Sequence, residues 1–295
     1  MNIRIGTAPD SWGVWFANDP RQTPASRFLD EAAEAGYEWI ELGPYGYLPT
    51  NPTVLKSELK RRNLKVSGTF VMGHIEQTDT FARLYEEAHS AGALLQELGA
   101  RYMVLIDDTY TDLFTGEPTG VARLNDGEWK RLLDGAHILG RLAKEKFGLK
   151  LAFHPHAETH VEYEDQIEEF LEGTDPAYVS LCLDTGHHAY RGGDPGRFLE
   201  KHFSRVAYLH LKSIDADKLR LVAQKQTPFA RAVELGVFCE PSRGVVDFLS
   251  LARLLKDRAY DGWATVEQDM FPAPFDQPLP IARRTRAYLR EIGLD

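Results

Sequence analysis

The chain has 295 residues and a formal net charge of −10, from 34 basic and 44 acidic side chains. An acidic chain repels a phosphate backbone, and the short basic runs at residues 60–62 and 283–286 are typical of solvated helix faces, so no nucleic-acid partner is expected. No apolar run approaches the roughly 20 residues of a membrane span, and no signal peptide is visible, so we expect a cytoplasmic protein without membrane contact.

Short apolar or β-branched runs alternate with amphipathic stretches along the whole chain, which is typical of repeated βα units around a parallel sheet. Strands are predicted at residues 3–6, 39–42, 66–70, 103–106, 149–153, 179–183, 206–209 and 264–266. Helices are predicted between them, including residues 26–35, 81–98, 129–146 and 248–258. This pattern favours a single (βα)8 TIM-barrel domain, of class α/β, over residues 1–295.

A doubly wound open sheet is the competing architecture. Such a sheet usually carries a glycine-rich phosphate loop after its first strand, whereas here that strand runs into the segment Ala8-Pro9-Asp10-Ser11-Trp12-Gly13. Three segments, at residues 107–126, 215–244 and 270–280, are predicted to be irregular. Each follows a predicted strand, so we expect all three at the C-terminal face of the barrel, where TIM-barrel enzymes build their active sites.

Four late strands each end in a side chain that can bind a metal. These side chains are His154, Asp184, His210 and Glu267. Because neighbouring strand ends converge on one barrel mouth, the four are predicted to lie close together. Two imidazoles and two carboxylates suit one divalent ion, with Mn²⁺ or Co²⁺ as the first choice and Mg²⁺, Fe²⁺ or Zn²⁺ as alternatives.

Further polar groups follow these ligands at short spacing. Residues at i and i+2 of a strand point to the same side, so these groups are expected at the same mouth. They are His156, His187, Lys212 and Asp269. His187 is placed in a loop, and the pair Lys212 and Asp269 could equally form a salt bridge at the rim.

The first half of the chain supplies candidates for substrate contacts at the early strand ends. They are Asp10, Trp12, Glu41, His74, Asp107 and Asp108. Trp12 and Trp15 could equally be packing residues. A polar pocket floored by aromatic rings suits a small polyol or sugar as substrate. The sequence is also compatible with a homo-oligomer.

Five segments resemble the xylose-isomerase-like TIM barrels, a sugar isomerase and epimerase superfamily, and within them the inosose dehydratases. The segments are residues 8–13, 153–156, 183–187, 210–212 and 262–267. The resemblance implies one divalent metal on His154, Asp184, His210 and Glu267. The broader superfamily has Glu at the position of His154. A histidine at this position matches the dehydratase branch. Where that branch often has a Pro-Gly-x-Gly turn, this chain has Pro241-Ser242-Arg243-Gly244, and Arg243 could contact substrate.

The resemblance implies a metal-dependent dehydratase, a carbon–oxygen lyase acting on an inosose-like cyclic keto-polyol through an enediolate, in inositol catabolism. We expect Lys212 or Glu267 to act as the base and His187 or His156 as the acid. The alternative is a sugar isomerase or epimerase acting on a ketose with the same metal site. Epimerases of this fold use two glutamates as an acid–base pair, and His154 removes one of them.

Two other classes fit less well. A DNA-repair endonuclease on a related barrel would need several metals and a basic groove, which the charge of −10 disfavours. A noncatalytic sugar-binding protein would not need four metal ligands and a surplus of titratable groups.

Overall fold

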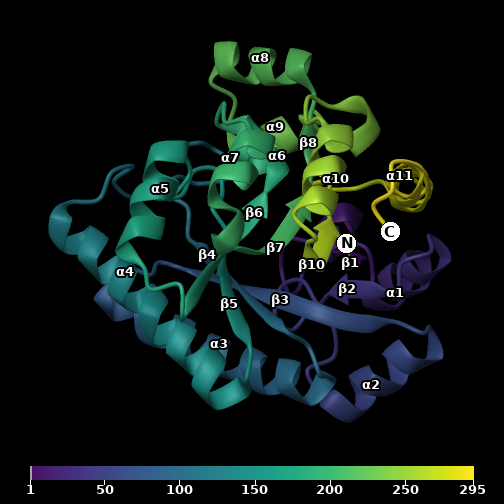
Figure 1. Cartoon of the computed structure of the whole chain (residues 1–295), viewed down its shortest axis with the longest axis horizontal. Helices are drawn as coiled ribbons and strands as arrows, with labels where there is room; N and C mark the ends of the chain where they lie inside the picture. The colour runs from purple at the N-terminus through teal and green to yellow at the C-terminus, as the bar shows by residue number, and fades with distance from the viewer. Residues whose placement is uncertain (1) are drawn as a thin grey trace.

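The computed structural model describes residues 2–295, and its central feature is a closed barrel of parallel strands (Figure 1). The barrel strands are β1 (Asn2–Thr7), β2 (Trp39–Glu41), β3 (Lys65–Gly73), β4 (Tyr102–Asp107), β5 (Lys150–Phe153), β6 (Val179–Asp184), β7 (Val206–Leu211) and β10 (Asp261–Val266). They follow the order β1-β10-β7-β6-β5-β4-β3-β2, and β1 closes the barrel on β10. The predicted TIM barrel is confirmed, and every predicted strand overlaps an observed one.

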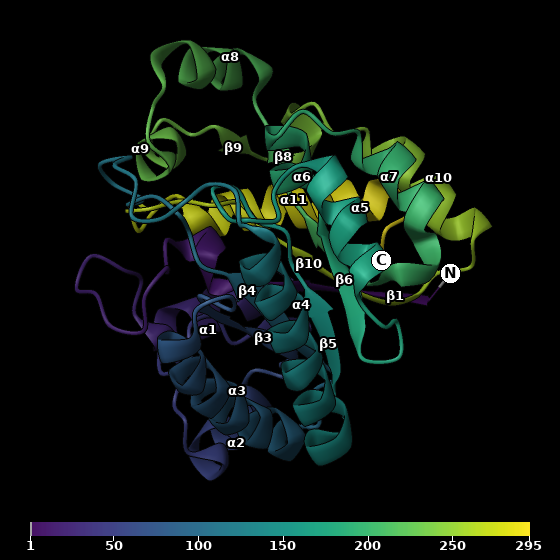
Figure 2. The same ribbon diagram turned by 90° about the vertical axis from the view of Figure 1, so that its left-hand side faces the viewer.

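Helices follow the strands and cover the outside of the barrel (Figures 1 and 2). The α-helices are α1 (Ala25–Glu34), α2 (Pro52–Arg61), α3 (Thr78–Leu98), α4 (Asp126–Arg141), α5 (Glu164–Gly173), α6 (Thr185–Tyr190), α7 (Pro195–His202), α8 (Ala216–Lys225), α9 (Phe229–Glu234), α10 (Phe248–Asp257) and α11 (Pro278–Glu291). Short turns of other helix types are η1 (Pro9–Trp12), η2 (Leu142–Lys146), η3 (Phe203–Arg205) and η4 (Pro241–Arg243). Over residues 2–295, the helices are all too short or too polar to cross a membrane.

Helix α4 illustrates how the local sequence sets these elements. The Asn125 side chain accepts hydrogen bonds from the first-turn amides, and the Glu128 carboxylate accepts one from the Asn125 backbone amide, which forms a capping box. Leu132, Ala136 and Leu139 then recur at helical spacing and are fully buried. The cap fixes where the helix begins, and the apolar stripe fixes which face packs on the barrel.

The interior of the barrel below its mouth is filled by aromatic side chains. The ring of Tyr208 lies 4.6 Å from the ring of Tyr102, and both are buried. The Tyr208 hydroxyl donates to Ser67 Oγ at 2.8 Å and shares a 2.6 Å hydrogen bond with Thr265. This floor lies directly beneath the mouth, because the Tyr208 ring is 5.6 Å from the ring of His210 on the same strand.

The segment at residues 215–244 is not irregular, which corrects the prediction. It contains α8, α9, η4 and the short strand β9 (Phe238–Cys239), which pairs antiparallel with β8 (Ser213–Ile214). Asp215 caps α8 by accepting two backbone amides, and α8 stands away from the barrel (Figures 1 and 2). The pattern was missed because these elements are short and α8 buries little of its surface.

Two connections are joined at the C-terminal side of the barrel. The backbone amide of Ala230, in α9, donates to the carbonyl oxygen of Leu113 at 2.9 Å. Leu113 belongs to the long connection at residues 108–125, between β4 and α4. A backbone hydrogen bond therefore ties the α9 segment to this connection.

Candidate metal centre

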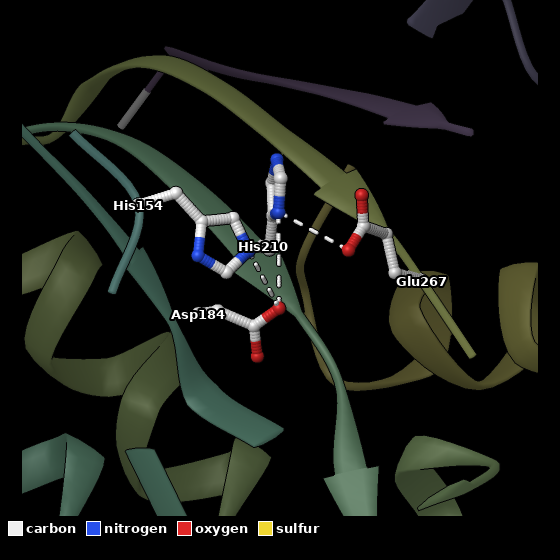
Figure 3. A group of neighbouring side chains, drawn as sticks. All are labelled: His154, Asp184, His210 and Glu267. Atoms are coloured by element: carbon white, nitrogen blue, oxygen red, sulfur yellow. Dashed lines mark ion pairs between the residues drawn. The ribbon is translucent and has the colours of Figure 1, made fainter. Parts of the chain in front are cut away.

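The four side chains predicted as metal ligands come together at the mouth (Figure 3). One donor atom from each of His154, Asp184, His210 and Glu267 lies within 4.8 Å of the others. His210 Nδ1 lies 3.1 Å from Glu267 Oε2 and 3.7 Å from Asp184 Oδ2. His154 Nε2 lies 3.5 Å from the same Asp184 oxygen. They stand at the ends of β5, β6, β7 and β10, which are neighbours in the barrel, and all four are buried.

The hydrogen bonds around these residues leave one free donor atom on each toward the centre. His154 Nδ1 donates to the Pro155 carbonyl at 2.8 Å, so Nε2 is left without a proton. His210 Nε2 lies 2.8 Å from Glu41 Oε1, so Nδ1 faces the cluster. Such outer partners orient metal-binding imidazoles and fix their tautomers. Among residues 2–295, His210 Nδ1 and Asp184 Oδ2 find no hydrogen-bond partner, so the donor set fits a divalent cation.

His187 lies in the first turn of helix α6, which corrects its predicted place in a loop. The helix begins here because Asp184 Oδ1 accepts the backbone amides of Gly186 and His187 at 2.7 and 2.8 Å. One carboxylate oxygen of Asp184 therefore caps the helix while the other points at the cluster. This arrangement explains why a polar residue ends an apolar strand.

Lys212 lies at the centre of the buried carboxylates rather than at the rim. Its Nζ is 3.2 Å from Asp184 Oδ2, 3.0 Å from Glu267 Oε2 and 3.0 Å from Asp269 Oδ1. Burial alone would lower the pKa of Lys212, but these three carboxylates raise that pKa well above its ordinary value. The side chain therefore holds a charged ammonium group next to the metal ligands.

Two imidazoles and an aromatic ring form the next layer of the site. The rings of His156 and His187 lie 3.9 Å apart, and His187 Nε2 is 3.4 Å from Asp269 Oδ2. Burial lowers the pKa of both histidines, which favours their neutral forms. Phe229 of α9 packs 5.3 Å from His156 and 5.8 Å from His187. Phe229 was missed because it belongs to the segment that was predicted to be irregular.

Asp10 joins the site from η1. Its carboxylate lies within 4.8 Å of oxygens of Glu267 and Asp269. Burial, followed by the charge of Glu267, raises the pKa of Asp10 well above its usual range. A protonated Asp10 can donate a hydrogen bond to a substrate oxygen.

Trp12 is a core residue, which corrects its place among the substrate contacts. It is fully buried, its indole N–H donates to Glu31 at 2.8 Å, and its ring packs edge-on against Phe28 of α1. Trp15 instead faces the site side of the chain, where its ring stacks 6.1 Å from Phe229. The two tryptophans have different surroundings although they are only three positions apart.

The other predicted substrate contacts occupy three separate places. Glu41 contacts His210, one of the four candidate ligands, at 2.8 Å. His74 lies 3.2 Å from Glu76, outside the four-ligand cluster. Arg243 is three-quarters exposed on the wall of a cavity of about 850 Å³.

This cavity runs beside the metal centre between the β9 segment and the connection that follows β10. Phe238 and Asp269 line it, together with Arg243 and Arg284. His154, Asp184, His210 and Glu267 are not among the residues that line this cavity. Phe238 and Asp269 lie between the cavity and these four side chains, since Phe238 packs against His187 and Asp269 contacts Lys212. The cavity therefore ends at the residues that surround the ligands.

The sequence matches the family described as Xylose isomerase-like TIM barrel over residues 29–292. Inosose dehydratases of Bacillus anthracis (strain CDC 684 / NRRL 3495) and Clostridium beijerinckii are 34% and 31% identical to it, each covering 98% of this chain and 97% of the relative. A solved structure of an IolI protein with a zinc atom has a TM-score of 0.73 at 15% identity, covering 97% of each chain. A 3-keto-D-glucoside 4-epimerase from E. coli has a TM-score of 0.71 at 18% identity, covering 98% of this chain and all of that one.

Proposed function

Because this chain belongs to the xylose isomerase-like TIM-barrel family and has inosose dehydratases among its full-length relatives, we propose that it dehydrates a cyclic keto-polyol such as an inosose. It would act as a metal-dependent carbon–oxygen lyase in inositol catabolism. The observation that carries the proposal is one mouth that combines four metal donors with Lys212, His187 and His156.

The metal is the first part of the proposal. A divalent ion on His154, Asp184, His210 and Glu267 would polarise the substrate ketone as a Lewis acid. The mixed nitrogen and oxygen donors favour Mn²⁺ or Co²⁺, while the zinc atom of the IolI structure supports Zn²⁺ as an alternative.

Removal of the proton next to the ketone falls to Glu267. One of its oxygens faces His210, while the other points away from it (Figure 3). Glu267 takes the proton, and the electron pair of the broken C–H bond forms the carbon–carbon double bond of an enediolate. The ammonium of Lys212, 3.0 Å from Glu267, balances the negative charge that develops on the substrate oxygens.

Departure of the hydroxyl completes the dehydration. The enediolate pushes out the hydroxyl on the next carbon, which leaves as water with a proton from the His156–His187 pair. Because burial favours neutral rings, the pair takes up this proton from solvent before it donates, and Glu267 returns its own proton to solvent, so the net change is loss of one water. Phe229, against both imidazoles, keeps this side of the site apolar.

The decisive experiment follows the mass of the substrate. Metal-loaded enzyme is incubated with an inosose and with a panel of linear ketoses, and the products are weighed by mass spectrometry. Loss of one water from the inosose supports the proposal. A new isomer of unchanged mass, formed with deuterium uptake from heavy water, would instead identify an epimerase.

A further inference from the structure

A second group of metal-capable side chains lies at or after the ends of β3, β4 and β5. Donor atoms of Glu76, Asp107 and His160 all lie within 4.8 Å of one another. Asp107 ends β4, Glu76 follows β3, and His160 follows β5. All three are at least nine-tenths buried. None of them contributes to the metal centre described above.

The histidine of this group is arranged like a metal ligand. His160 Nε2 donates to the backbone carbonyl of Val121 at 3.0 Å, so Nδ1 is the nitrogen that faces Asp107 Oδ2, at 2.6 Å. His154 at the first centre shows the same arrangement, with one ring nitrogen on a backbone carbonyl and the other toward the carboxylates. A backbone partner of this kind is usual for imidazoles that bind metals.

Two buried polar atoms at this group have the free valence that a cation would use. Among residues 2–295, Glu76 Oε2 and His74 Nδ1 are buried and make no hydrogen bond. His74 Nδ1 lies 3.2 Å from Glu76 Oε1, close enough for both to share one ion. Arg131 approaches, but it donates to the backbone carbonyl of Glu76 and not to its carboxylate. A buried carboxylate oxygen without a partner is costly, and a divalent cation would remove that cost.

We propose that Glu76, Asp107 and His160 bind a second divalent metal ion, with His74 as the fourth donor. Its donor set of two imidazoles and two carboxylates matches that of the first centre, so it would take the same class of ion. The ion has a structural role, because His160 also holds Val121 in the connection at residues 108–125. This proposal does not depend on the reaction that the first centre performs.

The alternative without a metal is an ion pair between a protonated His160 and Asp107. The two cases differ in metal content, which can be counted once the first centre has been emptied. The double variant Asp184→Ala/His210→Ala serves this purpose. It is treated with a chelator, reloaded with Co²⁺, passed through a desalting column and analysed for metal.

One equivalent of Co²⁺ in the double variant, with absorption bands of protein-bound Co²⁺, is the expected result. Adding the isosteric change Glu76→Gln to the double variant should abolish this Co²⁺ binding. The matched control, Glu87→Gln on α3, should leave the Co²⁺ bound. Adding His160→Gln should also remove it if that variant folds, as checked by circular dichroism. A double variant without bound Co²⁺, or an equivalent that survives Glu76→Gln, would overturn the proposal. Because no turnover is measured, its failure is separate from failure of the dehydratase proposal.

Discussion

Two layers of the barrel interior, only two residues apart on the same strand, are built on opposite principles. On β7, Tyr208 belongs to the floor and His210 to the mouth. The floor satisfies itself, because the Tyr208 hydroxyl has partners on Ser67 and Thr265. The mouth does not, since over residues 2–295 the buried atoms His210 Nδ1 and Asp184 Oδ2 make ion-pair contacts but no hydrogen bond. The floor is organised for stability, whereas the mouth has the incomplete bonding that a ligand completes.

Removing a donor from the mouth should have the largest effect. Asp184→Ala is expected to lose the metal of the first centre and all measurable dehydration, because it removes both a ligand and the cap of α6. Elemental analysis and the water-loss assay measure this. Asp261→Ala, an exposed carboxylate at the start of β10, is the control and should keep both. Full metal content of the first centre in Asp184→Ala would contradict the assignment.

Lys212→Met should separate the charge of the mouth from its metal. The variant is expected to keep the metal and to lose turnover by about 10²–10⁴-fold, the usual contribution of a positioned proton-transfer or charge-stabilising group. Steady-state kinetics at saturating metal provide the measurement, with metal content determined on the same sample. Near-normal turnover would reduce Lys212 to a partner in a buried salt bridge.

Glu41→Gln tests the residue that contacts the candidate ligand His210 from outside the cluster. The amide keeps the shape of Glu41 but loses the charge that orients and strengthens His210 as a donor. Metal affinity should fall by about 10–100-fold, as is typical for such outer partners. Titration calorimetry with Co²⁺ measures the affinity, and turnover at saturating Co²⁺ should recover. An unchanged affinity would show that the contact with His210 is not needed for binding.

Tyr208→Phe addresses the floor and should have the smallest effect. Removing the hydroxyl leaves the partners on Ser67 and Thr265 short of one bond, at a cost of about 1–3 kcal/mol of stability. Urea unfolding should show this loss while metal content and turnover stay at the wild-type level. A loss of metal in this variant would mean that the two layers are not independent.

The sequence allowed the barrel and the clustering of the four candidate ligands to be predicted because both depend on local signals. Polar residues such as His154 and Asp184 interrupt apolar runs at strand ends, and barrel closure does the rest. The partners of these ligands could not be predicted in the same way. Glu41 meets His210 across 169 positions of the chain, and only the folded backbone brings them together.

Site residues on short helices could not be predicted from the sequence either. Phe229 lies in a six-residue helix with no strong periodic signal, so its contact with His156 and His187 left no trace in the pattern. The prediction for Trp12 as a substrate contact was wrong for a different reason, because its local sequence was misleading. Its place in the segment at residues 8–13 suggested a site residue. In the structure its indole N–H donates to Glu31 of α1, and its ring is buried in the core.

The hydrogen bond between Ala230 and Leu113 has a kinetic consequence. It couples α9 to the connection at residues 108–125, and α9 carries Phe229 against the imidazoles next to the buried ligands. If either segment moves, this hydrogen bond draws the other with it, so on this side the site opens through both together. Where such a movement is slower than the chemical steps, its rate limits the number of turnovers per second.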